Sequence, residues 1–589
     1  MKKLVQAVKD KIPTNKNQEK NSEQIIPLKP VGVLGHGSYG TVYDAVSPRG
    51  SHYAIKRNFS SENIRGIGAV RESDLMIKLS HHQHIVNLKD FKKDALPQNP
   101  LSPPPTGMSA DPLYFVMHKA DTDLENLIHD SIVNNYSYRD MKYIMFQTLT
   151  ALDFLHDSGV LHRDIKPGNI LVNHVERDGK KYPHARLCDF GLSTQHTTQG
   201  YLTPNTYTMT YRAPEVCIVQ LRDEAGLDYD NYSYPADVWA LGCVWYHMIA
   251  GAPFMQPLEE NEHQLIAILQ YGPDEVYPET VKAALGPVVC RNLSDCTWDQ
   301  RPYRRENRLS FGARAVPLLI ARRFEQETSN GSSSIYQYVD LLSKILRWNP
   351  CDRLTVKQCL NHPWFAEYQE LLGHYRKFYQ PVAWNDRVQI PRCIEREWSG
   401  KIARDLYDQG NCSREIENWY SNRILFHALD GFDRWLSYKL STASPDALES
   451  LDRGKVYSRL EAESVFWTLV YLYTKYFHSS ILFSPYEEIV PATYRENPRL
   501  QELMDQTELQ ILSRGNLYHL TLFEAADLAG VRLNRQQIGD LVLMYMMGSI
   551  PRDGRIQDIF AGYMKIVQGC SVISDLDRRE REIRKAILR

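Results

Sequence analysis

The chain has 589 residues, of which 43% are hydrophobic and 24% are charged, so it can bury more than one core and cannot be disordered throughout. Its 69 basic and 71 acidic residues nearly cancel, and the formal net charge of −2 excludes the strong basic field expected of a bulk nucleic-acid binder. No apolar run approaches the ~18 residues of a membrane span. No targeting signal is evident, and ten scattered cysteines without a CxxC pair favour reduced thiols, as in a cytoplasmic or nuclear protein.

The first part of the chain is predicted to be a flexible leader followed by a β-rich segment. Residues 1–27 are rich in Lys, Asn and Gln, a composition typical of disorder. Strand-like patterns follow from Val31 to Ile55, and a helical stretch lies near Gly66–Leu79. The proline-rich residues 96–112 predict an exposed loop.

The rest of the chain is predicted to be mainly helical. A short buried strand at 113–118 precedes a long helical region that includes 141–156, and helices then alternate with loops as far as 362–365. The composition changes there, and residues 390–570 are almost entirely helical in pattern and rich in Trp, Tyr and Leu. We find no internal repeat.

A glycine-rich string, GHGSYGTV at 35–42, is the first candidate site. Glycines at Gly35, Gly37 and Gly40 allow a hairpin to lie over phosphates without Cβ clashes, although such strings also occur in ordinary turns. The string AIK follows at 54–56. A lysine held on a strand, such as Lys56, can bind nucleotide phosphates, but a lone lysine is more often simply solvated.

Three further strings occur in a fixed order: HRDIKPGN at 162–169, DFG at 189–191 and APE at 213–215. Together with the glycine-rich string and Lys56, this order is the protein-kinase signature. Over about residues 28–366 the chain therefore resembles a eukaryotic-type protein kinase. The resemblance implies an α+β, bilobal kinase fold, with a β-sheet and one helix in the N-lobe and a helical C-lobe.

The resemblance implies a role for each matching residue, and phosphoryl transfer chiefly needs positioning and charge neutralisation. Asp164 would accept the proton of the substrate hydroxyl, and Lys166 would contact the transferring phosphoryl group. Asn169 and Asp189 would supply the hard oxygen ligands that suit Mg²⁺. Asp237, in the string DVWALG, would orient the catalytic loop. ATP and Mg²⁺ are the implied cofactors.

The same resemblance predicts how ATP is bound. Lys56 would bind the α- and β-phosphates, oriented by Glu72 on the first helix, and His118–Ala120 would form the hinge. Outside the pocket, Glu215 and Arg353 would form a buried structural ion pair. The remaining pocket residues match family positions, although the apolar ones are also compatible with plain core: Gly35, Gly37, Gly40, Val42, Ala54, Met117, Ala120, Asp123 and Leu171.

The helix that carries Glu72 indicates which group of kinases the chain resembles. The string GIGAVRE at 66–72 is similar to the PSTAIRE-type helix of cyclin-dependent kinases, and its AVRE part matches well. Its two glycines each weaken a helix by roughly 1 kcal/mol, so we expect a partner to hold Glu72 inward. Tyr211 and Arg212 are also typical of the wider group, in which the arginine favours a proline just after the target residue.

Three positions match sites at which relatives in this group are phosphorylated. Thr203 lies where relatives carry the activating phosphothreonine, whose phosphate binds an arginine cluster. Arg71 and Arg163 match two members of that cluster, but a threonine stands at the third position, which argues against strict dependence on the phosphate. Ser38 and Tyr39 match inhibitory sites, where a phosphate would repel ATP. All three are also compatible with ordinary loop residues.

The helical half contains strings that resemble a cyclin box: RCIEREW at 392–398, ILFHAL at 424–429 leading into DRWLS, and ELQIL at 508–512. The resemblance implies a buried pair between Lys475 and Glu508 that faces the kinase, which would specify an interface more than stabilise it. The chain departs from the cyclin pattern in two ways. A rival alignment puts a proline in place of the lysine, and too few residues follow the first cyclin box to form a full second one. An unrelated helical module is the alternative.

These observations predict the domains and the function of the chain. The predicted function is a Ser/Thr protein kinase that acts on protein substrates and is activated in cis by its cyclin-like domain, since the linker makes activation intramolecular. Two alternatives remain open: a kinase whose C-terminal half docks another protein, and a catalytically silent scaffold. The predicted divisions are a flexible leader 1–27, a protein kinase domain 28–366, a linker 367–385, a cyclin-like helical domain 386–575 and a charged tail 576–589.

Overall fold

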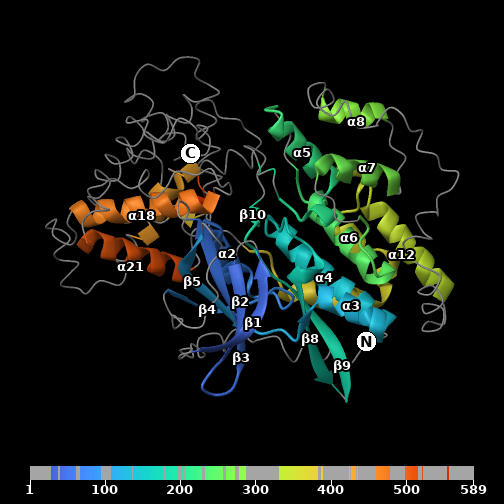
Figure 1. Ribbon diagram of the computed structural model, residues 1–589, viewed down its shortest axis with the longest axis horizontal. Helices are drawn as coiled ribbons and strands as arrows, with labels where there is room; N and C mark the ends of the chain where they lie inside the picture. Colours follow the sequence, from blue (N-terminus) through green and yellow to red (C-terminus); the bar gives the residue numbers. More distant parts are fainter. Residues whose placement is uncertain are drawn as a thin grey trace.

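The computed structural model describes most of the N-terminal part of the chain and several segments of the C-terminal part (Figure 1). The predicted leader and the predicted charged tail lie outside the described residues. Within the described residues, every helix is too short or too polar to cross a membrane. The described residues are 28–37, 40–61, 67–93, 108–134, 137–177, 179–195, 202, 204, 206–227, 232–255, 260–271, 278–286, 331–382, 387–388, 423–424, 426–432, 434–435, 459–477, 498–514, 521 and 554–555.

An antiparallel sheet in the order β1-β2-β3-β5-β4 forms the first lobe. The glycine-rich string lies at its β1–β2 hairpin, where Gly35 pairs with Val42. One face of the sheet buries a small core that includes Ala45 and Ile55. The strands are β1 (Lys29–Gly37), β2 (Gly40–Val46), β3 (His52–Ser61), β4 (Leu88–Lys93) and β5 (Met108–His118).

Helix α2 (Ile67–Leu79) belongs to this lobe and buries an unusual set of side chains. Its apolar face, which includes Leu75, enters the main hydrophobic core of the molecule. The same helix also buries Arg71, Glu72 and Asp74. Burying charged groups is unfavourable unless each finds a partner. The surroundings of α2 therefore decide whether this helix is stable.

The second lobe is mainly helical and is built around α6, where Trp239 and Trp245 are fully buried. Gly242 allows α6 to approach α12 closely, because a Cβ there would lie 2.5 Å from Ile345 Cγ2. The helices are α3 (Leu124–Asn134), α4 (Tyr138–Asp157), α5 (Pro214–Glu224), α6 (Pro235–Ala250), α7 (Asn261–Tyr271), α8 (Pro278–Leu285), α12 (Gly331–Ile345), α13 (Val356–Leu360) and α14 (Gln369–Phe378). The 3₁₀ turns are η1 (Pro167–Asn169), η2 (Met209–Tyr211), η4 (Pro350–Asp352) and η5 (Pro363–Tyr368).

Two small sheets carry the loops that contain the kinase strings. The loop that contains the HRD string runs from β7 to β8, and the DFG string follows β9. Because β7 pairs with β10, the start of the catalytic loop and the start of the segment after DFG are held side by side. One sheet consists of β6 (Thr122–Asp123), β8 (Ile170–Arg177) and β9 (Lys180–Leu187), and the other of β7 (Val160–Leu161) and β10 (Thr194–Gln195).

Part of the predicted linker 367–385 is a folded element of the helical lobe. Helix α14 buries Leu371, Leu372 and Tyr375, and the Tyr375 ring lies 6.0 Å from the ring of Phe146 on α4. The segment resembles a linker in composition because its other face is charged. Its short apolar stripe nevertheless has a surface to pack against, which only the folded lobe supplies.

The described helices of the C-terminal half pack on α2. Helix α18 (Arg459–Phe477) and helix α21 (Pro498–Arg514) contact each other and α2, and Figure 1 shows them in orange and red beside the blue α2. Leu429 and Leu469 of this half belong to the same continuous core as Leu75 of α2. The two halves of the chain therefore share one apolar core.

A cyclin-box fold for this half stays a prediction. The string at 392–398 lies outside the described residues, whereas 424–429 falls in a largely helical stretch. Lys475 belongs to α18 and Glu508 to α21, but the side chain of Lys475 lies outside the described part. Two short strands, β11 (Arg387–Val388) and β12 (Gly554–Arg555), pair the beginning of this half with its later part.

Candidate active site

The loop that carries Asp164 is held in place by Asp237 of α6. The Asp237 carboxylate accepts hydrogen bonds from the backbone N–H groups of His162 (2.8 Å) and Arg163 (2.9 Å). Arg163 has a φ of 66°, a left-handed conformation that costs about 1–3 kcal/mol in a non-glycine residue, and these bonds offset that strain. Burial raises the pKa of Asp237, but the bond from His156 and nearby positive charge outweigh it, so the pKa lies below its usual value.

Asp164 lies at the centre of a hydrogen-bonded cluster. Lys166 Nζ lies 2.8 Å from Asp164 Oδ2, and Asn169 Nδ2 donates to the same oxygen at 2.9 Å. Thr208 Oγ1 donates to Asp164 Oδ1 at 2.8 Å and accepts from Lys166 at 3.2 Å. Burial lowers the pKa of Lys166, but the Asp164 carboxylate outweighs it and the pKa is raised. Both oxygens of the Asp164 carboxylate are thus fixed by neighbours.

A second cluster joins β3, α2 and the DFG string. Lys56 Nζ donates to Glu72 Oε1 at 2.7 Å and Oε2 at 2.9 Å, and to Asp189 Oδ1 at 2.7 Å. Asp189 has a φ of 64°. Phe190 is fully buried with its ring 5.2 Å from that of His162. The structure therefore brings together predicted residues from three distant parts of the chain.

Burial and charge act in opposite directions in this cluster. Burial raises the pKa of Glu72 to about 6 against the attraction of Lys56. Burial lowers the pKa of Lys56, but the carboxylates of Asp189 and Glu72 outweigh it, so that the pKa ends above its usual value. Burial raises the pKa of Asp189, and Lys56 more than reverses this effect. One ammonium between two carboxylates leaves excess negative charge, which favours a bound cation.

Asn169 and Asp189 fit a Mg²⁺ ion through oxygens that remain available. Asn169 uses its amide nitrogen to donate to Asp164, which leaves the amide oxygen as a ligand. Asp189 uses Oδ1 for Lys56, which leaves Oδ2. The Cys188 N–H donates to the Asn169 carbonyl at 3.0 Å, so the two segments lie against each other. Mg²⁺ takes oxygen ligands and typically few of them from protein.

The sheet register places the predicted apolar pocket residues at neighbouring positions. Ala54 of β3 pairs with Met117 of β5, and Leu171 of β8 pairs with Asp123 of β6. Val42 lies on β2, directly opposite the lysine of β3. The glycines predicted to cover the phosphates lie on β1 and β2, at the hairpin between them.

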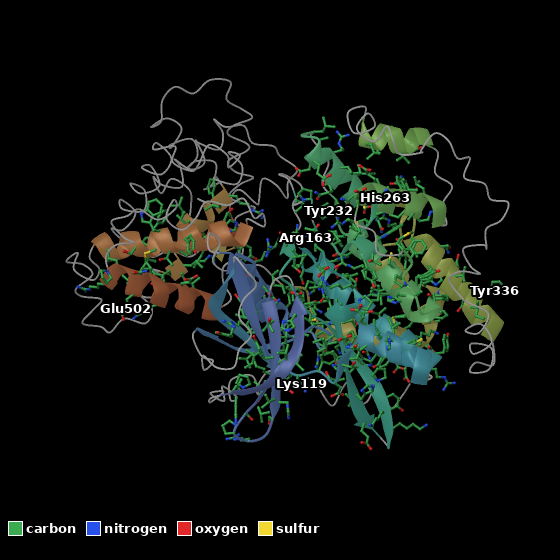
Figure 2. The ribbon with its side chains drawn as sticks, in the orientation of Figure 1. Lys119, Arg163, Tyr232, His263, Tyr336 and Glu502 are labelled. Carbon is green, nitrogen blue, oxygen red and sulfur yellow. The ribbon has the colours of Figure 1, made fainter. Side chains whose placement is uncertain are left out.

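The hinge connects β5 to β6 and contains Ala120, which is partly buried. Asp123 at its end accepts hydrogen bonds from both the backbone N–H and the side chain of Asn126, at 2.8 and 2.7 Å. These bonds cap α3, a structural role that the prediction did not include. Lys119 Nζ lies 2.6 Å from Asp44 Oδ2 and so ties the hinge to β2; Figure 2 labels this lysine.

Sequence reasoning missed Thr208 and the contact that Arg212 makes. Arg212 Nη2 donates to the carbonyl of Tyr207 at 2.8 Å, Nε donates to it at 3.3 Å, and Nη1 donates to Asn261 Oδ1 at 2.7 Å. Tyr207 has a φ of 61°. The only local signal for Thr208 is its position six residues before the proline of APE, because its partner Asp164 lies 44 residues away.

Several predicted residues lie elsewhere or outside the described part. Glu215 and Arg353 form a bidentate ion pair at 2.6 and 2.7 Å, away from the two clusters above. Ser38, Tyr39 and Thr203 lie outside the described residues, so their predicted phosphorylation is untested.

Comparison with known proteins gives a consistent picture. Residues 28–365 match the protein kinase domain. Mitogen-activated protein kinase PMK1 of Pyricularia oryzae is 30% identical over 344 residues, which is 57% of this chain and 81% of that protein. Mitogen-activated protein kinase 7 of Arabidopsis thaliana is 30% identical over 346 residues, 58% of this chain and 78% of that protein. Mitogen-activated protein kinase 4 of Oryza sativa subsp. japonica is 29% identical over 347 residues, with the same coverage.

Proposed function

The chain belongs to the protein kinase family as a Ser/Thr protein kinase that uses ATP and Mg²⁺ and acts on proteins, and we propose that it prefers a Ser or Thr followed by Pro and is activated in cis by its C-terminal helices. The observation that carries this proposal is the contact of α18 and α21 with α2 while Lys56 Nζ and Glu72 Oε1 lie 2.7 Å apart. Helix α2 thus holds its glutamate inward with the C-terminal helices in place.

We assign Asp164 as the base that accepts the proton of the incoming Ser or Thr hydroxyl. Its carboxylate is oriented by Thr208, Asn169 and Lys166, and the positive charge of Lys166 offsets negative charge at the transferring group. Lys56, kept charged by two carboxylates, binds the α- and β-phosphates. When bound by Asn169 and Asp189, Mg²⁺ supplies further neutralisation of the phosphate charge.

The contact between Arg212 and Tyr207 supports the preference for proline. Tyr207 precedes Thr208, which touches Asp164, so its carbonyl lies close to where the residue after the target would bind. Because Arg212 already donates to that carbonyl, it is not free to accept the N–H of that residue. Proline has no N–H and loses nothing there, whereas other residues would leave a donor unpaired.

The composition of α2 supports activation by the C-terminal helices. Gly68 lies inside the helix and lowers its intrinsic stability, and its charged residues are buried. Both features require a partner surface, and α18 and α21 provide one. The resemblance of 66–72 to helices of cyclin-dependent kinases points the same way. The relatives named above are mitogen-activated protein kinases, and their alignment covers only 57–58% of the chain.

Phosphate transfer from ATP to matched Ser-Pro and Ser-Ala peptides tests this proposal. We expect the full chain to phosphorylate the Ser-Pro peptide with a kcat/KM at least about tenfold higher, as one unpaired donor implies. Equal use of both peptides would refute the proline preference. No transfer to any Ser or Thr peptide would instead favour a silent scaffold.

A further inference from the structure

Tyr476, close to the end of α18, contacts three parts of the kinase domain. Its hydroxyl accepts a hydrogen bond from the side-chain amide of Gln195 and donates to Asp74 Oδ2 at 3.3 Å. Its backbone carbonyl accepts from Arg71 Nη1 at 3.4 Å. The residue is buried. A single residue of the C-terminal half thus reaches both α2 and β10.

These contacts lead directly to the catalytic groups. Gln195 pairs with Val160 of β7, just before the catalytic loop. Arg71, held by the Tyr476 carbonyl, donates through Nη2 to the carbonyl of Gly191 in the DFG string at 3.1 Å. Tyr476 is therefore connected through Gln195 to the start of the catalytic loop, and through Arg71 to Gly191, which lies two residues after the proposed metal ligand Asp189.

The arginines that match a phosphate-binding cluster already have acceptors. Arg163 donates to the Leu192 carbonyl at 2.6 Å and to the Tyr232 hydroxyl at 3.1 Å, and Figure 2 labels Arg163 and Tyr232 side by side. Burial and the nearby charge of Arg163 lower the pKa of Arg71 to about 10. Within the described part, neither guanidinium pairs with a carboxylate. The carbonyl of Tyr476 belongs to the last turn of α18, the negative end of the helix dipole.

We propose that Tyr476 is a positioning residue. Through it, the C-terminal half holds α2 against the start of the segment that follows the DFG string, so that the kinase remains arranged for phosphoryl transfer without a phosphate on Thr203. The last turn of α18 supplies one neutral carbonyl acceptor to Arg71, a guanidinium that a phosphate would otherwise bind. Thr194, at the third position of the cluster, removes one phosphate ligand and fits this arrangement. The inference rests on the proposed activation in cis.

The first test uses the full chain and its Thr203→Ala variant, both treated with phosphatase. We expect kcat and KM for a Ser-Pro peptide within about threefold of those of the untreated wild type, because no catalytic contact is lost. A loss of about a hundredfold or more in Thr203→Ala, or activity that appears only after Thr203 is phosphorylated, would overturn the proposal.

The second test removes the hydroxyl with Tyr476→Phe and uses Tyr473→Phe as the matched control. Tyr473 lies on the same helix and is equally buried, but its ring packs at 5.2 Å against His427 of the C-terminal half. We expect Tyr476→Phe to lower kcat about five- to tenfold through the loss of buried hydrogen bonds, with peptide KM unchanged. Tyr473→Phe should leave kcat within about twofold even if both variants melt at lower temperature.

A double-mutant cycle with Gln195→Leu separates positioning from general destabilisation. If the hydroxyl acts through Gln195, the double variant should lose little beyond the loss in Tyr476→Phe. Equal kcat for Tyr476→Phe, Tyr473→Phe and wild type would overturn the role of Tyr476, as would fully additive losses in the cycle. A wild-type chain that transfers no phosphate in any state would refute the proposed function instead.

Discussion

The catalytic loop and helix α2 are both rich in buried polar groups, but they are held from different places. The loop is held by Asp237 of α6, 73 residues after Asp164 in the same lobe. Helix α2 is held by Tyr476, 402 residues after Asp74. The kinase domain therefore contains the contacts that shape its catalytic loop, whereas helix α2, which carries Glu72, packs against helices from another part of the chain.

The comparison predicts that the two regions fail differently. Damage to the catalytic loop removes chemistry from a protein that remains assembled. Damage to the surface around α2 changes how often the assembled state is populated, and kcat falls in proportion.

The largest effect is expected from Asp164→Asn, which removes the proposed base but keeps the shape of the side chain. We expect kcat to fall by roughly three orders of magnitude or more, because positioning and electrostatics act as one unit. ATP binding, measured by calorimetry, should be unchanged and is the control. Transfer at the wild-type rate would contradict the assignment of Asp164.

The next largest effect is expected from a chain that ends at Val382. This chain keeps α14, and the Val382 N–H still donates to the hydroxyl of Ser158 at 3.0 Å. We expect kcat/KM to fall by roughly a hundredfold, since α2 loses its partner surface. A thermal melt and ATP binding show whether the shortened chain is folded.

A full chain cut at a protease site introduced between 383 and 386 is the matched control for this truncation. Both pieces are present after the cut, but they are no longer linked. The cut therefore removes the effective concentration, near the millimolar range, that the linkage provides. Activity should then fall on dilution and return when the pieces are concentrated. Undiminished activity in both the chain that ends at Val382 and the cut full chain would indicate that the C-terminal half only docks other proteins.

A smaller effect is expected from Arg212→Lys, which tests the substrate-facing side of the catalytic region. Lysine cannot donate two parallel hydrogen bonds to the Tyr207 carbonyl. The ratio of kcat/KM between Ser-Pro and Ser-Ala peptides should fall by about tenfold. The ratio is measured within one enzyme and so cancels any general loss of activity; an unchanged ratio would show that Arg212 does not set the preference.

The last prediction concerns stability in acid rather than activity. In the turn after α2, burial lowers the pKa of His84 to about 3 and that of His82 well below its usual value. His84 Nδ1 donates to the Ala185 carbonyl at 2.8 Å and Nε2 lies 3.0 Å from the Tyr375 hydroxyl. Both pKa values lie below those of the unfolded chain, which binds protons first as pH falls. Stability should therefore be full above about pH 6.5 and decline toward pH 3, by up to about 1.4 kcal/mol per pH unit for each histidine.

Urea unfolding at pH 7, 6 and 5 measures this decline. His84→Gln is the control, because it keeps a polar side chain that cannot titrate, and its slope should be shallower than that of the wild type. Equal slopes would show that His84 does not govern acid sensitivity and that the buried groups around α2 do.

The side chains that meet in the two clusters could be predicted from the sequence because each lies in a short string whose local geometry is nearly self-contained. The HRD string places Asp164, Lys166 and Asn169 within eight positions, and the DFG string supplies Asp189, so the order of the strings along the chain predicts the fold and the chemistry. The α+β bilobal architecture, the first strands and helix α2 follow from the same strings and from local patterns. Strand β4 (Leu88–Lys93) was not predicted, and β5 begins at Met108, inside the segment 96–112 that was predicted to be a loop.

Contacts between distant segments were decided only by the tertiary structure. No local signal joins Thr208 to Asp164, Tyr476 to Asp74 or α14 to α4. The segment 367–385 has the composition of a linker because one face of α14 is charged. Buried polar contacts depend on which surfaces meet, since a carboxylate or hydroxyl is stable inside a protein only beside its partner. The sequence by itself therefore predicted which side chains would carry the reaction, and the tertiary packing decided which neighbours they contact.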